Sequence, residues 1–228
     1  MEPERTLTRS QLTTPRAAAI AGILFSVLLI TSLVLIRLAV PLNPQDAGDW
    51  LADGWRMVSL ALNLLPFAGI AFLWFIGVVR DRLGEYEDRL FATVFLGSGL
   101  LFLAMLFASA AGARGTIEKD GTTPSMLIES GMYAFGRTVT YEIINVYTMK
   151  MAGVFMITTS TLSLRTGIIP RWMAYLGLAL ALFLLFSLGF FAWAPLVFPL
   201  WILLISGHIL LANLRRSQSA NTTATPKG

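Results

Sequence analysis

The feature of this sequence that most constrains its fold is a series of long apolar runs that recurs along almost the whole chain. A helix needs about 20 mainly apolar residues to cross the hydrocarbon core of a bilayer. No water is present there to satisfy backbone polar groups, so the helix must satisfy them within itself. The sequence therefore predicts an all-α, polytopic bundle of six transmembrane helices, at residues 17–38, 58–79, 91–112, 139–163, 172–190 and 195–213.

Little of the chain lies outside these runs. Charged residues make up 13% of the 228 residues, whereas soluble domains usually contain about 25%. The first run is longer than the apolar region of a cleaved signal peptide, which is about 7–15 residues. We expect a cytoplasmic leader at residues 1–16, one six-helix membrane domain at 17–213, and a polar, disordered cytoplasmic tail at 214–228.

Basic residues are unevenly distributed between the two sides of the predicted bundle. Cytoplasmic loops of membrane proteins carry an excess of Lys and Arg. With the amino terminus inside, eleven of the 17 basic residues fall on inner segments, five on outer segments, and Lys150 within a helix. This bias predicts a multi-pass protein of the plasma membrane with both termini cytoplasmic. It also explains the net charge of +4 without a nucleic-acid partner.

Two outer loops are long enough to have structure of their own. Residues 41–57 begin with two prolines and carry Trp50 and Trp55. Because Trp is favoured at membrane–water interfaces, they are read as a short interfacial helix, with a lid over an external pocket as the alternative. Residues 113–137 form the longest loop, and loops of this length are often functional or disordered.

The predicted fourth helix is chemically unlike the others. It contains Glu142, Asn145 and Lys150 together with several Thr and Tyr residues. An ionisable residue at the centre of a membrane helix costs about 2.5–3.5 kcal/mol on insertion scales. We therefore expect this helix to lie in the interior of the bundle. In an α-helix, Glu142 and Asn145 share one face, whereas Lys150 lies about 12 Å along from Glu142 and roughly 80° around.

These charges have a functional and a structural interpretation. They can form an ion or proton relay, or a counter-charge for an anionic ligand. Alternatively, Lys150 bonds to backbone carbonyls, loses its proton or extends along the helix towards the surface. Glu142 could then lock helices together through Arg37, Arg56 or Arg137.

Other polar positions add to this picture. Pro66 in the second helix frees a backbone carbonyl that Asn63 or water could satisfy, at the depth of Glu142. His208 is the only histidine and has no ligand partner at metal-site spacing, so no metal is predicted. With no cysteine in the chain, disulfides and thiol chemistry are excluded. We expect no cofactor and no catalytic residue, because the sequence contains none of the common hydrolase or nucleotide-binding motifs.

Small residues recur at four-residue spacing, as in Ala18 with Gly22 and Gly177 with Ala181. Such pairs let helices approach closely, either within one chain or across a homodimer.

The stretch from Thr166 to Leu185 resembles the inner loop and fifth helix of a broad group of bacterial six-span membrane proteins whose functions are uncharacterised. Pro170, Arg171, Trp172 and Gly177 carry the resemblance. It implies a bacterial source and agrees with six spans, but implies no activity and no site residues.

The function expected from these features is non-enzymatic. We predict a binding or transport protein, or an accessory subunit, with an outward-facing polar pocket on the fourth helix. Its partners would be membrane lipids, a small molecule or ion, and a homo-oligomer or larger membrane complex. The alternatives are an intramembrane enzyme that uses Glu142 or Lys150 as acid or base on an apolar substrate, and a structural scaffold. The candidate ligand- or ion-binding residues are Glu142, Asn145, Lys150, Tyr141, Arg137, Asn63 and Arg37.

Overall fold

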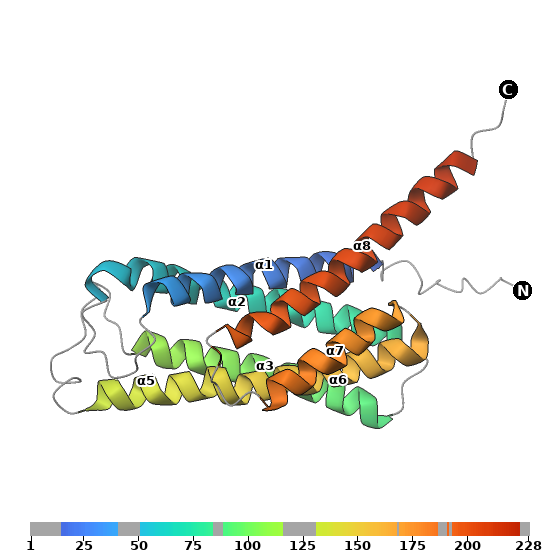
Figure 1. Ribbon diagram of the computed structural model, residues 1–228. Helices are drawn as coiled ribbons and strands as arrows, with labels where there is room; N and C mark the ends of the chain where they lie inside the picture. The colour runs from blue at the N-terminus through green and yellow to red at the C-terminus, as the bar shows by residue number, and fades with distance from the viewer. Residues whose placement is uncertain are drawn as a thin grey trace, which may run out of the picture.

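The chain was analysed as a computed structural model, which describes residues 15–40, 51–83, 89–115, 131–167, 169–186, 191 and 193–223. In this part of the chain the regular elements are all helical. They lie side by side in an elongated bundle (Figure 1). The expected all-α fold class is therefore confirmed.

Six helical segments make up the bundle. Three long helices come first: α1 (Pro15–Ala39), α2 (Leu51–Leu83) and α3 (Arg89–Gly115). The fourth helical segment is continuous and consists of α5 (Met132–Glu142), the π-helix η1 (Ile143–Thr148) and α6 (Met149–Thr166). The short helix α7 (Arg171–Phe186) follows, and then the 3-10 turn η2 (Ala194–Leu196), which continues into α8 (Val197–Thr223).

Four of these helices are long and apolar enough to span a membrane: Arg16–Ala39, Gly54–Arg80, Leu90–Gly115 and Ala194–Arg215. The other two predicted spans coincide with helices that fall short of this standard for different reasons. The fourth segment is rich in Thr and Ser and contains Lys150. Helix α7 is apolar but has only 16 residues.

Several predicted boundaries were wrong. Residues 51–57 begin helix α2 and do not form a separate interfacial helix, while Trp50 and the rest of 41–50 lie outside the described residues. Of the predicted loop at 113–137, the described parts belong to the end of α3 and the start of α5. The tail predicted as disordered from residue 214 continues helix α8 to Thr223, because no Gly or Pro follows Gly207 in that stretch to end the helix.

A cluster of phenylalanines joins five of the helical segments at the centre of the bundle. The Phe72 ring of α2 lies 4.5 Å from Phe25, 5.3 Å from Phe102, 5.3 Å from Phe155 and 5.7 Å from Phe198, measured between ring centroids. All five side chains are fully buried. Tilted and edge-on aromatic pairs contribute about 0.5–1.5 kcal/mol each beyond the burial of apolar area. The cluster therefore fixes how α1, α2, α3, α6 and α8 pack.

Helix α6 is enclosed by its neighbours. From Thr148 to Leu164 no residue is exposed, whereas every other long helix has exposed apolar side chains. Several hydroxyl groups of α6 donate to its own carbonyl oxygens, with Thr159 Oγ1 2.8 Å from Phe155 O and Ser163 Oγ 2.7 Å from Thr159 O. The buried Ser160 hydroxyl has no hydrogen-bond partner among the described residues. The expectation that the fourth helix lies in the bundle interior is confirmed for this half. The other half, α5, is largely exposed.

Two glycines allow close helix contacts within the chain. A Cβ atom on Gly22 of α1 would collide with Ser206 Oγ of α8 and lie 3.0 Å from the Phe75 ring. A Cβ atom on Gly177 of α7 would collide with Ser160 Oγ of α6 and lie 2.7 Å from Trp201 Nε1 of α8. Both small-residue motifs therefore serve packing within one chain, which is the first of the two interpretations.

Alanine substitutions at these glycines test the packing. Gly22→Ala and Gly177→Ala should each lower the free energy of unfolding by about 1–3 kcal/mol, the usual effect of overpacking a well-filled interior. Thermal unfolding in detergent would measure this. Adding Ser206→Ala to Gly22→Ala should restore part of the loss, because the colliding oxygen is removed.

The matched controls are Gly77→Ala and Gly207→Ala, where a Cβ atom meets nothing within 4 Å. They should be neutral or slightly stabilising, since Ala favours helix over Gly. Equal effects at all four glycines would contradict the packing described above.

Candidate functional site

The seven predicted site residues do not form a single cluster. Arg37, in the last turn of α1, lies within electrostatic range of Tyr141 on the fourth segment. Arg137 and Asn145 lie one turn to either side of Tyr141 on the same helix face. Glu142 and Lys150 lie on another flank of that segment, and Asn63 lies on α2 and bonds to α3.

A row of polar side chains lies on α5 and η1. Tyr133, Arg137, Tyr141 and Asn145 recur every four residues, which places them on neighbouring turns of one helix face. We call these four residues the polar stripe. Tyr133 is only 6% exposed and Asn145 only 7% exposed. Arg37, in the last turn of α1, is half-buried and lies within electrostatic range of Tyr141, so the end of α1 lies near this part of the stripe.

Hydrogen bonding within the stripe is incomplete. Asn145 Nδ2 donates to the Tyr141 carbonyl oxygen at 2.9 Å. The buried hydroxyl of Tyr133 has no hydrogen-bond partner among the described residues. A buried polar group without a partner is unfavourable by about 1–3 kcal/mol. This hydroxyl therefore favours binding of a polar group at the stripe.

The π-helix η1 determines which side chains share a face. Thr148 Oγ1 donates to the Ile143 carbonyl oxygen, five residues back, at 2.7 Å. A π-turn holds one residue more than an α-turn, so it rotates every later residue by about 100° relative to a regular helix. Lys150 thereby moves from roughly 80° to within about 20° of the direction of Glu142.

The prediction that Glu142 and Asn145 meet on one face was therefore wrong, because Glu142 is exposed and Asn145 is buried. Glu142, Tyr147 and Lys150 instead follow one another along the exposed side of the segment, and we call them the charged flank. Tyr147 is 58% exposed and Lys150 is half-buried. Within the described part of the chain, Glu142 and Lys150 have neither an ion pair nor a hydrogen bond, so Glu142 does not pair there with Arg37, Arg56 or Arg137.

The short helix α7 explains why Lys150 is partly exposed. Leu185, next to the last residue of α7, lies 3.1 Å from the Cβ position of Gly153. Lys150 precedes Gly153 by about one turn, on the side where α7 has already ended. Figure 1 shows that the end of α7 and the start of α8 stop short of the end of the bundle at which α5 begins.

Aromatic side chains lie at the level where α7 ends and α8 begins. Phe191 and Trp193, between α7 and α8, are exposed, and η2 directly after them packs against η1 and the end of α1. Exposed aromatic residues at helix ends are typical of a membrane–water interface. The π-helix therefore lies at the level of these exposed aromatic residues, with Glu142 towards the end of the bundle at which α5 begins and Lys150 further from that end.

Asn63 has a different role from the one predicted. Its Oδ1 accepts a hydrogen bond from Arg114 Nη2 at 2.7 Å, which joins α2 to the last turn of α3. Both side chains are exposed, and neither belongs to the polar stripe or the charged flank. The sequence contained no signal for this pair, because the two residues are far apart in the chain.

His208 lies half-buried on α8. In the residues that the structure describes, no group of three or more His, Asp and Glu side chains could hold a metal ion.

Comparisons with known proteins add no identification. No protein-family model, no curated protein and no solved structure matches this chain. Similarity therefore assigns the chain neither a family nor an activity.

Proposed function

We propose that the chain is a six-span plasma-membrane protein with both termini in the cytoplasm, which binds a small anionic ligand at its outer end. Two observations support six spans. The fourth segment runs antiparallel to α3 (Figure 1). Helix α7 begins at the charged residue Arg171 and ends at the aromatic residue Phe186. Helix α7 rises about 24 Å, and a bilayer of about 30 Å can thin locally around a short helix.

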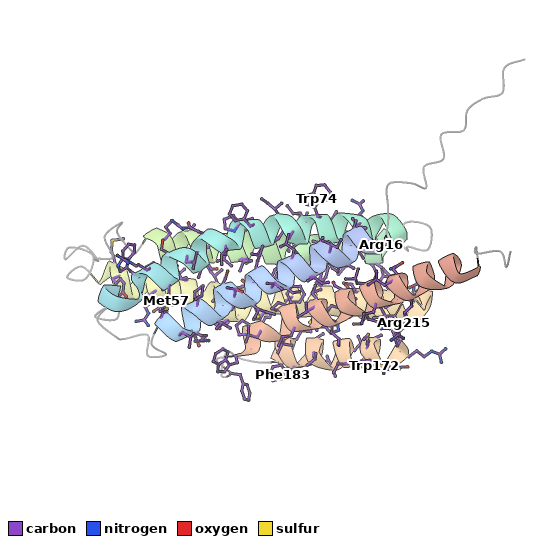
Figure 2. All side chains as sticks on the ribbon, turned by 90° about the horizontal axis from the view of Figure 1, so that it is seen from above. Arg16, Met57, Trp74, Trp172, Phe183 and Arg215 are labelled. Atoms are coloured by element: carbon purple, nitrogen blue, oxygen red, sulfur yellow. The ribbon has the colours of Figure 1, made fainter. Side chains whose placement is uncertain are left out.

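The orientation is supported by the grouping of basic residues. Arg16 and Arg215 lie towards one end of the bundle together with Trp172, whereas Met57 lies towards the other end (Figure 2). At the first end, the Arg165 guanidinium also lies 4.6 Å from the centre of the Phe91 ring. A cytoplasmic location for this end follows from the positive-inside rule.

Cysteine labelling tests the topology without background, because the chain has no cysteine. Met132→Cys and Trp193→Cys, both at exposed side chains, should react with a membrane-impermeant maleimide in intact cells. Leu90→Cys, which is also exposed, should react only after permeabilisation. A Trp193→Cys protein that labels only from the inside would rule out α7 as a span.

The binding site is proposed on one observation: Arg37 of α1 lies within electrostatic range of Tyr141, in a polar stripe whose Tyr133 and Asn145 side chains are almost fully buried. Two guanidinium groups, from Arg37 and Arg137, suit a carboxylate or phosphate group, which they can bind through paired hydrogen bonds. The Tyr133 hydroxyl supplies a further donor. The ligand would approach between α1 and α5, above η2.

The same arrangement favours binding over acid–base catalysis. Glu142 and Lys150, the candidate acid and base, lie on the charged flank and not on the stripe. A ligand at the stripe would therefore meet Arg, Tyr and Asn groups, which orient a charge and transfer no proton readily near neutral pH.

Ligand-induced stabilisation tests this proposal. The purified chain in nanodiscs would be heated with inorganic phosphate, succinate, and the cations choline and putrescine. At least one of the two anions should raise the unfolding temperature, since a ligand at 100 times its Kd adds about 2.7 kcal/mol of stability. Arg37→Gln and Tyr133→Phe should remove most of that increase.

Arg56→Gln is the matched control, because Arg56 lies at the same end but is exposed and stacks on the Trp55 ring at 5.6 Å. It should leave the increase unchanged. Stabilisation by the cations alone, or an equal loss in Arg56→Gln, would contradict an anion site at the polar stripe.

A further inference from the structure

The charged flank is a second candidate binding site. Glu142, Tyr147 and Lys150 lie on the exposed side of the fourth segment, in line with the exposed apolar residues Phe135 and Val139. A charged side chain on a membrane-facing surface is unfavourable unless it reaches water or a partner. Neither charge has a partner in the described part of the chain. A group that carries both charges would satisfy the two residues together.

The spacing of the two charges excludes a direct ion pair. Eight residues separate the Glu142 and Lys150 backbones by about 12 Å, or slightly less across the π-turn. Helix side chains lean towards the amino-terminal end, so Lys150 extends about 6 Å towards Glu142 while the Glu142 carboxylate leans away from it. A gap of roughly 6–9 Å remains between the two charged groups. One small group with a negative and a positive charge a few bonds apart can bridge this gap.

We propose that the charged flank binds the headgroup of a zwitterionic phospholipid. The Lys150 ammonium contacts the phosphate, the Glu142 carboxylate accepts hydrogen bonds from the headgroup ammonium, and the Tyr147 ring lies between them. The order of charges supports this assignment. In a bilayer the phosphate lies deeper than the ammonium, and Lys150 lies deeper in the bundle than Glu142. Both depths are measured from the nearer membrane surface, so the match between the headgroup and the two residues is the same in either leaflet.

The surface beside the flank suits the acyl chains. Helix α7 ends one turn below Lys150, and its exposed side chains Leu182 and Phe186 are apolar. A lipid whose phosphate is held at Lys150 can lay its chains over this face.

A second copy of the protein does not fit the flank equally well. Two copies in one membrane are related by a two-fold axis along the membrane normal, so each residue meets its counterpart at the same depth. Glu142 would then face Glu142, and Lys150 would face Lys150. Phosphatidylglycerol, an anionic phospholipid, also fits less well, because its headgroup offers Glu142 hydroxyl groups but no positive charge.

Lipid retention by the full chain tests the proposal. The protein in detergent would be titrated separately with dioleoyl phosphatidylethanolamine and dioleoyl phosphatidylglycerol, and bound lipid would be counted by native mass spectrometry. The zwitterionic lipid should bind at least about tenfold more tightly, as one additional charge-assisted contact predicts. Glu142→Gln should abolish this preference, and Lys150→Gln should weaken binding of both lipids.

Two further variants complete the test. Exchanging the charges, by Glu142→Lys with Lys150→Glu, should also abolish the preference, because the order of charges is then reversed relative to the headgroup. Arg37→Gln should leave the preference for the zwitterionic lipid unchanged, because the polar stripe lies on another face. The lipid result therefore does not depend on whether the anion site exists. Equal binding of the two lipids by the unaltered chain, or an unchanged preference in Glu142→Gln, would overturn the proposal.

Discussion

The packing of this protein depends on enclosing a polar helix. Helix α6 carries Thr and Ser at positions where lipid-facing helices carry Leu or Ile, and no residue from Thr148 to Leu164 is exposed. In a hydrocarbon environment such a helix is stable only where its hydroxyl groups are satisfied and other helices cover it. Its own carbonyl oxygens accept hydrogen bonds from Thr158, Thr159 and Ser163, whereas the buried Ser160 hydroxyl has no partner among the described residues. The phenylalanine cluster holds α1, α2, α3 and α8 around the helix.

Enclosure stops at the level where α7 ends and α8 begins, and the chemistry changes there. The π-helix lies there and directs the side chains of the fourth segment to two sides. Tyr141 of the polar stripe lies near Arg37 of α1 and Asn145 is buried, whereas Glu142 is exposed and Lys150 is half-buried on another flank. The extra residue of the π-turn therefore places Glu142 and Asn145 on different faces, whereas a regular helix would have placed them on one face. This is consistent with the frequent occurrence of π-turns at functional sites.

Features of the fold that depend on local hydrophobicity could be predicted from the sequence. Where the structure describes them, all six apolar runs lie in helices, and the interior position predicted for the fourth run from its polar and ionisable residues is confirmed for α6. The α5 half of this run is largely exposed. The π-turn was not predictable, because one additional residue leaves the hydropathy pattern unchanged. The bond between Asn63 and Arg114 and the phenylalanine cluster were missed because they join residues distant in the chain. The helical tail after residue 213 was missed because its polarity was taken as a sign of disorder.

We infer that the fourth segment is closed to water in its α6 half and accessible to water in its α5 half. Single cysteines at Tyr141, Asn145 and Ser160 would test it most directly, in a chain with no cysteine of its own. A small membrane-impermeant thiol reagent added from outside should modify Tyr141→Cys readily and Asn145→Cys more slowly, and should leave Ser160→Cys unmodified. Modification of Ser160→Cys at the rate of Tyr141→Cys, or protection of all three positions, would contradict this account.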